Sequence, residues 1–158
     1  MVAAAAGPPA GPAAAVRADV SKLCFQDAGL RRTCVAEWRG RVLLLKLWAS
    51  WCMPCRSELP MFDGLKARLG SAEFDVVALS VDRAGLPAVH RAFAQLGIRN
   101  LTAYVDAQVT ATEDLGARGI PTTLLIDRHG REIARTTGPV DWGRPEQLLA
   151  IQRALAEQ

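Results

Sequence analysis

The sequence predicts one α/β domain built on a mixed central sheet, and three observations support this. Apolar runs at 41–49 and 74–81 indicate strands that are buried on both faces, as in α/β proteins. Strand-like and helix-like segments alternate along most of the chain, which implies parallel pairing through βαβ units. Two cysteines, Cys52 and Cys55, stand two residues apart where the first of these strands gives way to a helix.

The expected elements follow from local patterns taken in chain order. A turn signal at 27–29 between two short β-rich runs predicts an N-terminal β-hairpin, and a turn at 129–130 predicts a second hairpin. Apolar residues at helical spacing, closed by Gly70 and Gly97, predict helices. The expected strands cover residues 22–26, 31–35, 41–49, 74–81, 101–105, 120–126 and 131–135. The expected helices cover residues 53–69, 87–96, 110–118 and 144–157.

The composition is that of an ordinary globular protein. Of 158 residues, half are hydrophobic and 22% are charged, and the formal net charge is +3. The basic residues are scattered, so nucleic acid is not an expected partner. No apolar stretch is long enough for a transmembrane helix. Residues 1–20 are expected to be a disordered Ala/Pro-rich tail or linker, and residues 21–158 the folded domain.

The predicted N-terminal hairpin carries Cys24 and Cys34. With a loop at 28–30 the two cysteines would lie opposite each other, with β-carbons about 4.5–5.5 Å apart. That distance is slightly wide for a disulfide, but modest twist can close it. A one-residue change in register would separate the pair. The residues therefore fit both a structural disulfide and two unpaired thiols, and a structural disulfide would favour an oxidising compartment.

The second cysteine pair has the position that thiol chemistry requires. The first turn of a helix leaves N–H groups unpaired and carries partial positive charge, which stabilises a thiolate at Cys52. We therefore expect Cys52 to attack a substrate disulfide, and Cys55, one turn further in and more buried, to resolve the mixed disulfide. A zinc site would need four Cys or His ligands in spaced pairs. Cys24 and Cys34 are not so spaced, so no metal is expected.

Two separated motifs resemble the thioredoxin superfamily, and most closely the TlpA-like and ResA-like thiol-disulfide oxidoreductases of bacterial envelopes. One motif is LWASWCMPCRSELP at 47–60, and the other is GIPTTLLID at 119–127. The two agree with the family in order and spacing, and the resemblance covers roughly residues 22–157. It implies a thioredoxin-like fold with a mixed sheet, flanking helices and the N-terminal hairpin as an extension. It also implies that Pro121 is a cis-proline facing the cysteine pair.

The resemblance extends to the substrate-binding surface. It places Trp51, Met53, Pro54 and Ile120 in contact with the substrate. Trp51 would flank and shield the cysteines, and the backbone at Ile120 would pair with a substrate strand. The redox-active disulfide Cys52–Cys55 would be the only redox group, so no cofactor is expected.

Two charged residues near the pair leave alternatives open. Glu58 lies one helical turn beyond Cys55 and matches an acid that ResA-like proteins keep near their thiols. It is either an acceptor for the Cys55 proton or a solvated helix carboxylate. Lys46 departs from the family, because thioredoxins usually have an acid here and TlpA-like proteins often have Asn. It must either reach solvent along its stem or be desolvated with a lowered pKa. In the second case it could tune the pKa of the thiols.

These expectations combine into a thiol-disulfide oxidoreductase that reduces protein disulfides in the bacterial envelope. The resemblance suggests cytochrome c or respiratory oxidase assembly as its context, and a membrane thiol-reductant as its electron donor. We expect a monomer in the periplasm, or one anchored to the membrane and facing the periplasm, with the export signal absent from this chain. The alternatives are a copper chaperone or a redox-inert binding module on the same fold. The direction of exchange, reducing or oxidising, stays open.

Overall fold

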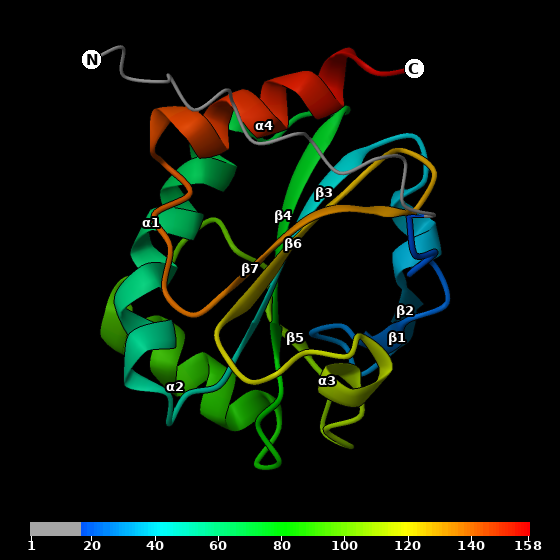
Figure 1. The fold of residues 1–158 in the computed structure, drawn as a ribbon. Coiled ribbons are helices and arrows are strands. Elements are labelled where there is room, and N and C mark those ends of the chain that lie inside the picture. The colour runs from blue at the N-terminus through cyan, green and yellow to red at the C-terminus, as the bar shows by residue number, and fades with distance from the viewer. Residues whose placement is uncertain (1–16) are drawn as a thin grey trace, which may run out of the picture.

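A computed structural model describes residues 17–158, which form a seven-stranded mixed sheet with helices on both faces (Figure 1). The strand order is β2-β1-β5-β4-β3-β6-β7. The strands are β1 (Cys24–Gln26), β2 (Arg32–Cys34), β3 (Val42–Trp48), β4 (Phe74–Ser80), β5 (Tyr104–Val105), β6 (Thr122–Ile126) and β7 (Glu132–Thr137). The helices are the 3-10 turn η1 (Val35–Trp38) and the α-helices α1 (Met53–Leu69), α2 (Leu86–Leu96), α3 (Ala111–Asp114) and α4 (Pro145–Ala156). The expected fold class is confirmed.

Strand β3 lies inside the sheet and is paired on both sides. Every residue of β3 and of β4 is buried, as their apolar sequences predict. β3 runs parallel to β4, and β4 runs parallel to β5. On its other side β3 is antiparallel to β6, which pairs with the antiparallel edge strand β7. The expected combination of parallel βαβ pairing and a final antiparallel hairpin is therefore confirmed.

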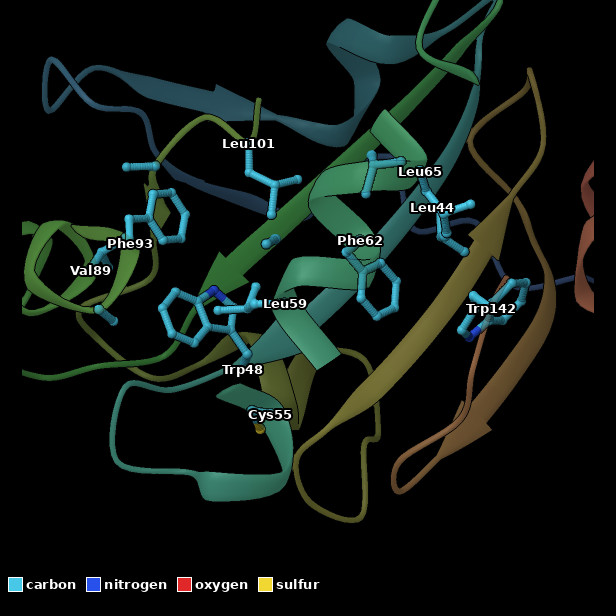
Figure 2. Close-up of a cluster of buried hydrophobic side chains, with 14 of the residues drawn as sticks. Leu44, Trp48, Cys55, Leu59, Phe62, Leu65, Val89, Phe93, Leu101 and Trp142 are labelled. Carbon is cyan, nitrogen blue, oxygen red and sulfur yellow. The ribbon is translucent and has the colours of Figure 1, made fainter. Parts of the chain in front are cut away.

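The two faces of the sheet are covered differently. Helices α1, α2 and α4 pack on one face, and η1 and α3 pack on the other. Figure 2 shows Leu59, Phe62 and Leu65 of α1 packed in one cluster with Leu44 and Trp48 of β3. Full burial of side chains of this size contributes about 1.5–3 kcal/mol each. Among residues 17–158, no helix is both long enough and apolar enough to cross a membrane.

Two elements have less than half the length that the sequence predicts. β5 is expected over 101–105 but contains only Tyr104–Val105. The Asp63 side chain explains this, because its carboxylate accepts hydrogen bonds from the backbone N–H groups of residues 99–101, which keeps them out of the ladder. α3 is expected over 110–118 but contains only Ala111–Asp114. It ends there because Gly116 adopts a left-handed backbone with φ 60°, a conformation that closes helices.

The folded domain begins before residue 21, so the expected tail boundary is wrong. Asp19 forms an antiparallel bridge with Arg131. The backbone N–H of Val20 donates to the Gly130 carbonyl at 2.9 Å, and the Val20 side chain is buried. Residues 17–20 therefore pack against the β6–β7 turn, which satisfies backbone groups that a free tail would leave to water. The rest of the expected tail, residues 1–16, lies outside the described residues.

The N-terminal hairpin has the register that places its cysteines opposite each other. Cys24 pairs with Cys34, and a disulfide joins them. The turn fixes this register, because the Asp27 carboxylate accepts from the N–H groups of Gly29 and Arg31 at 2.8 and 2.9 Å. Of the two arrangements that the sequence leaves open, the structure has the disulfide.

Removing this disulfide should destabilise the domain. The cross-link closes a loop with a sequence separation of 10, and a loop of that length restricts the unfolded chain by about 3 kcal/mol. The double variant C24S/C34S should lose about that much unfolding free energy in urea titrations, with Cys52–Cys55 kept oxidised in both proteins. Q26S, a change at an exposed hairpin position, is the matched control. A double variant within about 0.5 kcal/mol of the native protein would contradict this prediction.

Candidate redox site

The second disulfide lies where the chain passes from β3 into α1. Cys52 is the N-cap of α1, and its sulfur accepts a hydrogen bond from the Cys55 N–H at 3.3 Å. The two cysteines are bonded, with α-carbons 5.2 Å apart. Cys52 is 6% exposed and Cys55 is fully buried at the end of the core cluster (Figure 2). The positive end of a 17-residue helix therefore faces the more accessible sulfur, which favours a thiolate there.

The strand register brings the distant proline motif to the same edge of the sheet. Leu47 of β3 pairs with Thr122 of β6. Pro121 therefore lies level with the end of β3, where the chain turns toward Cys52. The Ile120–Pro121 peptide bond is cis, as the family resemblance implies. The Pro121 carbonyl accepts from the Gly138 N–H at 2.8 Å, which ties this segment to the end of β7.

The residues around the accessible sulfur form an exposed apolar rim. Trp51 is 69% exposed and Met53 is 67% exposed, and Pro54 beside them is also exposed. Trp51 flanks Cys52 as expected, but most of its indole faces solvent, so it shields the cysteine pair less than the resemblance implies. An exposed apolar rim next to a reactive group is typical of a surface that contacts another protein.

The Lys46 side chain does not reach solvent; it is completely buried beneath α1. Its Nζ donates to Glu58 Oε2 at 2.8 Å and lies 4.6 Å from the centre of the Phe62 ring. Burial lowers the pKa of Lys46 below its ordinary value, while the hydrogen bond and the charge of Glu58 act in the opposite direction. Of the two alternatives for Lys46, the structure has the desolvated one.

Glu58 is likewise not a solvated helix carboxylate. It is 8% exposed, and it lies on the face of α1 that packs on β3. Only one of its oxygens is used by Lys46. The other, Oε1, is buried and has no hydrogen-bond partner among the described residues. Glu58 lies one helical turn beyond Cys55, so Cys55 and Glu58 are neighbours on the surface of α1.

A buried carboxylate that the sequence analysis missed holds the loop before Cys52. Asp82, 2% exposed, lies two residues after the end of β4. It accepts from the Ser50 N–H at 2.8 Å, the Ser50 hydroxyl at 2.6 Å and the Ser80 hydroxyl at 2.6 Å. On the other side of Ser50, the Arg56 guanidinium donates to its carbonyl at 3.3 Å. The sequence did contain a signal for this contact, because Asp82 follows the strand expected at 74–81. Parallel strands β3 and β4 end at the same edge of the sheet, so a polar residue after β4 lies near the loop that follows β3.

The remaining titratable side chains do not assemble into a second centre of this kind. Within residues 17–158, no group of three or more His, Cys, Asp or Glu side chains is arranged to hold a metal ion. His90 and His129 are both exposed.

A disulfide at a helix start beside a cis-proline, on a sheet of this strand order, is the arrangement of thioredoxin-like proteins. Comparison with protein families agrees with the geometry. The Redoxin family matches residues 6–150, which is most of the chain, so this chain belongs to the Redoxin family.

Known relatives narrow the resemblance further. Thiol-disulfide oxidoreductase ResA of Bacillus subtilis is 25% identical over 120 residues, covering 76% of this chain and 66% of ResA. Thiol:disulfide interchange protein HelX of Rhodobacter capsulatus is 32% identical over 117 residues, covering 73% of this chain and 59% of HelX. The matches therefore span less than two thirds of these relatives' own length.

A solved structure agrees with these relatives. A Chlorobium tepidum protein, assigned as the thiol:disulfide interchange protein DsbE, superposes with a TM-score of 0.78 and is 25% identical. The match covers 89% of this chain and 97% of that one. Within the thioredoxin superfamily the chain is therefore ResA-like.

Replacing Asp82 should loosen the loop that carries Cys52. The variant D82A leaves the Ser50 N–H and two hydroxyls without their acceptor, and each buried donor left unpaired costs about 1–3 kcal/mol. We expect the free energy of unfolding to fall by about 3 kcal/mol and amide exchange at the Ser50 N–H to rise. D114A, which removes an exposed aspartate of α3, should change neither. Unchanged exchange at Ser50 in D82A would contradict the assignment.

Proposed function

We propose that this chain is a thiol-disulfide oxidoreductase that exchanges Cys52–Cys55 with the disulfides of other proteins. The observation that carries the proposal is the contrast within one disulfide at the start of α1. Cys52, at the helix terminus, keeps 6% of its surface exposed, whereas Cys55, one turn later, is fully buried in the core. Disulfide exchange needs one sulfur that a substrate can reach and a second that attacks only inside the protein, and this difference in exposure provides both.

The exchange balances two electrons between the two disulfides. In the reduced protein the Cys52 thiolate attacks one sulfur of the substrate disulfide, that bond breaks, and the other substrate sulfur leaves as a thiolate. A mixed disulfide now joins Cys52 to the substrate. Cys55 gives up its proton and attacks the Cys52 sulfur, which releases the second substrate thiol and re-forms Cys52–Cys55. The substrate is reduced and the protein is oxidised.

The surface around Cys52 supports a protein as the substrate. The rim of Trp51, Met53 and Pro54 offers apolar contact beside the reactive sulfur. In the described part of the chain, the backbone N–H and carbonyl of Ile120 have no hydrogen-bond partner. An extended substrate segment could pair with them as an added strand. Shallow apolar contact and backbone pairing together suit many polypeptide sequences, so we assign these four residues to substrate binding.

Resolution by Cys55 requires a proton acceptor inside the core. Glu58 is the carboxylate next along α1, and its Oε1 is free to accept a hydrogen bond. We assign it to this step. No cofactor enters the cycle, because the disulfide itself carries the electrons.

We place the protein in the periplasm, or anchored at the membrane and facing the periplasm, as a monomer that reduces its substrates. The Cys24–Cys34 disulfide supports an oxidising compartment. The resemblance of the motifs at 47–60 and 119–127 to TlpA-like and ResA-like oxidoreductases supports a role in cytochrome c or respiratory oxidase assembly, with electrons from a membrane thiol-reductant. A reduction potential near −270 mV for Cys52–Cys55 would support the reducing direction, and one near −120 mV would reverse it.

Serine variants of the two cysteines test the exchange itself. C52S should reduce insulin disulfides no faster than the reductant alone, because the attacking thiolate is gone. C55S should accumulate a mixed disulfide through Cys52, which non-reducing electrophoresis detects. The C24S/C34S variant, whose change lies outside the site, should keep the native rate. A C52S protein as active as the native one would instead mean that the disulfide is static and that the chain is a binding module.

A further inference from the structure

A buried ion pair between Lys46 and Glu58 lies beneath the redox site. We propose that Lys46 is a positioning residue that keeps Glu58 ionised as the proton acceptor for Cys55. This inference rests on the proposed function and deepens it, because it says how the internal thiol is activated.

One carboxylate oxygen of Glu58 pairs with Lys46, and the other remains to accept the Cys55 proton. Lys46 Nζ holds Oε2 at 2.8 Å, and Oε1 is buried without a partner among the described residues. The lysine is wholly buried and the carboxylate is 8% exposed, so water screens the pair little. Cys55, one helical turn from Glu58, is fully buried as well. The unpartnered oxygen is therefore the acceptor available to the Cys55 proton in this part of the core.

The charges balance only when the lysine is present. Before the transfer, the site holds a neutral Cys55 thiol, the Glu58 carboxylate and the Lys46 ammonium, with a sum of zero. After the transfer it holds a thiolate, a carboxylic acid and the same ammonium, and the sum is again zero. Without the lysine both states would bury one negative charge. A buried carboxylate without a counter-charge then binds a proton more readily, and a protonated acid accepts no second proton.

Glu58 is the charged side chain that contacts Lys46 among its neighbours on the sheet and on α1. On the sheet, Lys46 is flanked by Ala78 of β4 and Thr123 of β6, which are uncharged. From α1 it faces Glu58 and the Phe62 ring.

The other charged groups on these elements are engaged elsewhere. On α1, Arg56 contacts Ser50 and Gln95, and Asp63 accepts from the backbone of residues 99–101. Lys66 pairs with Asp75 of β4, and Arg68 donates to the Gly64 carbonyl. β6 carries no charged residue. The Lys46 charge is therefore directed at Glu58.

A two-phase reaction separates the two cysteines. Reduced protein is mixed with a small aromatic disulfide that releases a coloured thiolate twice, first when Cys52 attacks and again when Cys55 resolves. The rate of the second phase against pH reports the acceptor that Cys55 uses. In K46M the acid limb of this profile should move to higher pH by about 1–3 units. K66M, which removes a lysine paired with Asp75 further along α1, should keep the native profile.

A second pair of variants shows whether Lys46 acts through Glu58. E58Q should slow the second phase about 100-fold, because the acceptor is lost. Adding K46M to E58Q should cause no further shift, since the two residues act as one unit. A native profile in K46M would overturn the proposal. So would a K46M shift that persists in the E58Q background, because Lys46 would then act on the thiol directly.

One measurement needs no Lys46 variant and stays decisive if K46M fails to fold. The infrared difference between native protein and E58Q at neutral pH should contain a carboxylate band from Glu58, and a protonated carboxyl band would overturn the proposal. The small reagent also keeps the two proposals apart. Failure to reduce insulin would count against the proposed function alone, while the second-phase profile would still report on Lys46.

Discussion

The pairing of β3 on both of its edges is the constraint on which the site depends. Its parallel ladder with β4 ends at the same edge of the sheet, which brings Asp82 to the loop before Cys52. Its antiparallel ladder with β6 places Pro121 level with that loop. α1, packed across the same strand, sets Cys52 at its positive end. Asp82, Pro121 and the helix terminus at Cys52 thus come from three distant parts of the chain, and one strand aligns them.

The ion pair between Lys46 and Glu58 places two charges inside this packed core. Removing two charges from water is unfavourable, and their attraction repays it only when the geometry is good and the remaining polar atoms are satisfied. Among the described residues one carboxylate oxygen of the pair has no hydrogen-bond partner, so the pair is poorly explained by stability alone. An apolar pair of similar volume would fill the same space without that penalty. Under the proposal above, the charges serve the chemistry of Cys55.

The sequence predicts what depends on local patterns and misses what depends on strand order. The buried runs of β3 and β4 and the helix start at Met53 follow from short stretches, and they are confirmed. The sequence left the hairpin register of Cys24 with Cys34 open, and the structure decides it. The contact of Lys46 with Glu58 joins a strand to a helix whose relative rotation the sequence does not state. Asp82 is informative only once β4 is known to lie beside β3. Backbone capping by Asp63 likewise joins distant segments, which is why β5 is shorter than expected.

The described chain enters the domain on the side opposite the redox site. Asp19 bridges Arg131 beside the β6–β7 turn, and that turn lies at the start of β3, whereas Cys52 follows its end. β3 alone spans about 20 Å. Arg17, where the described residues begin, therefore lies toward one pole of the domain, and the Cys52 sulfur lies at the other.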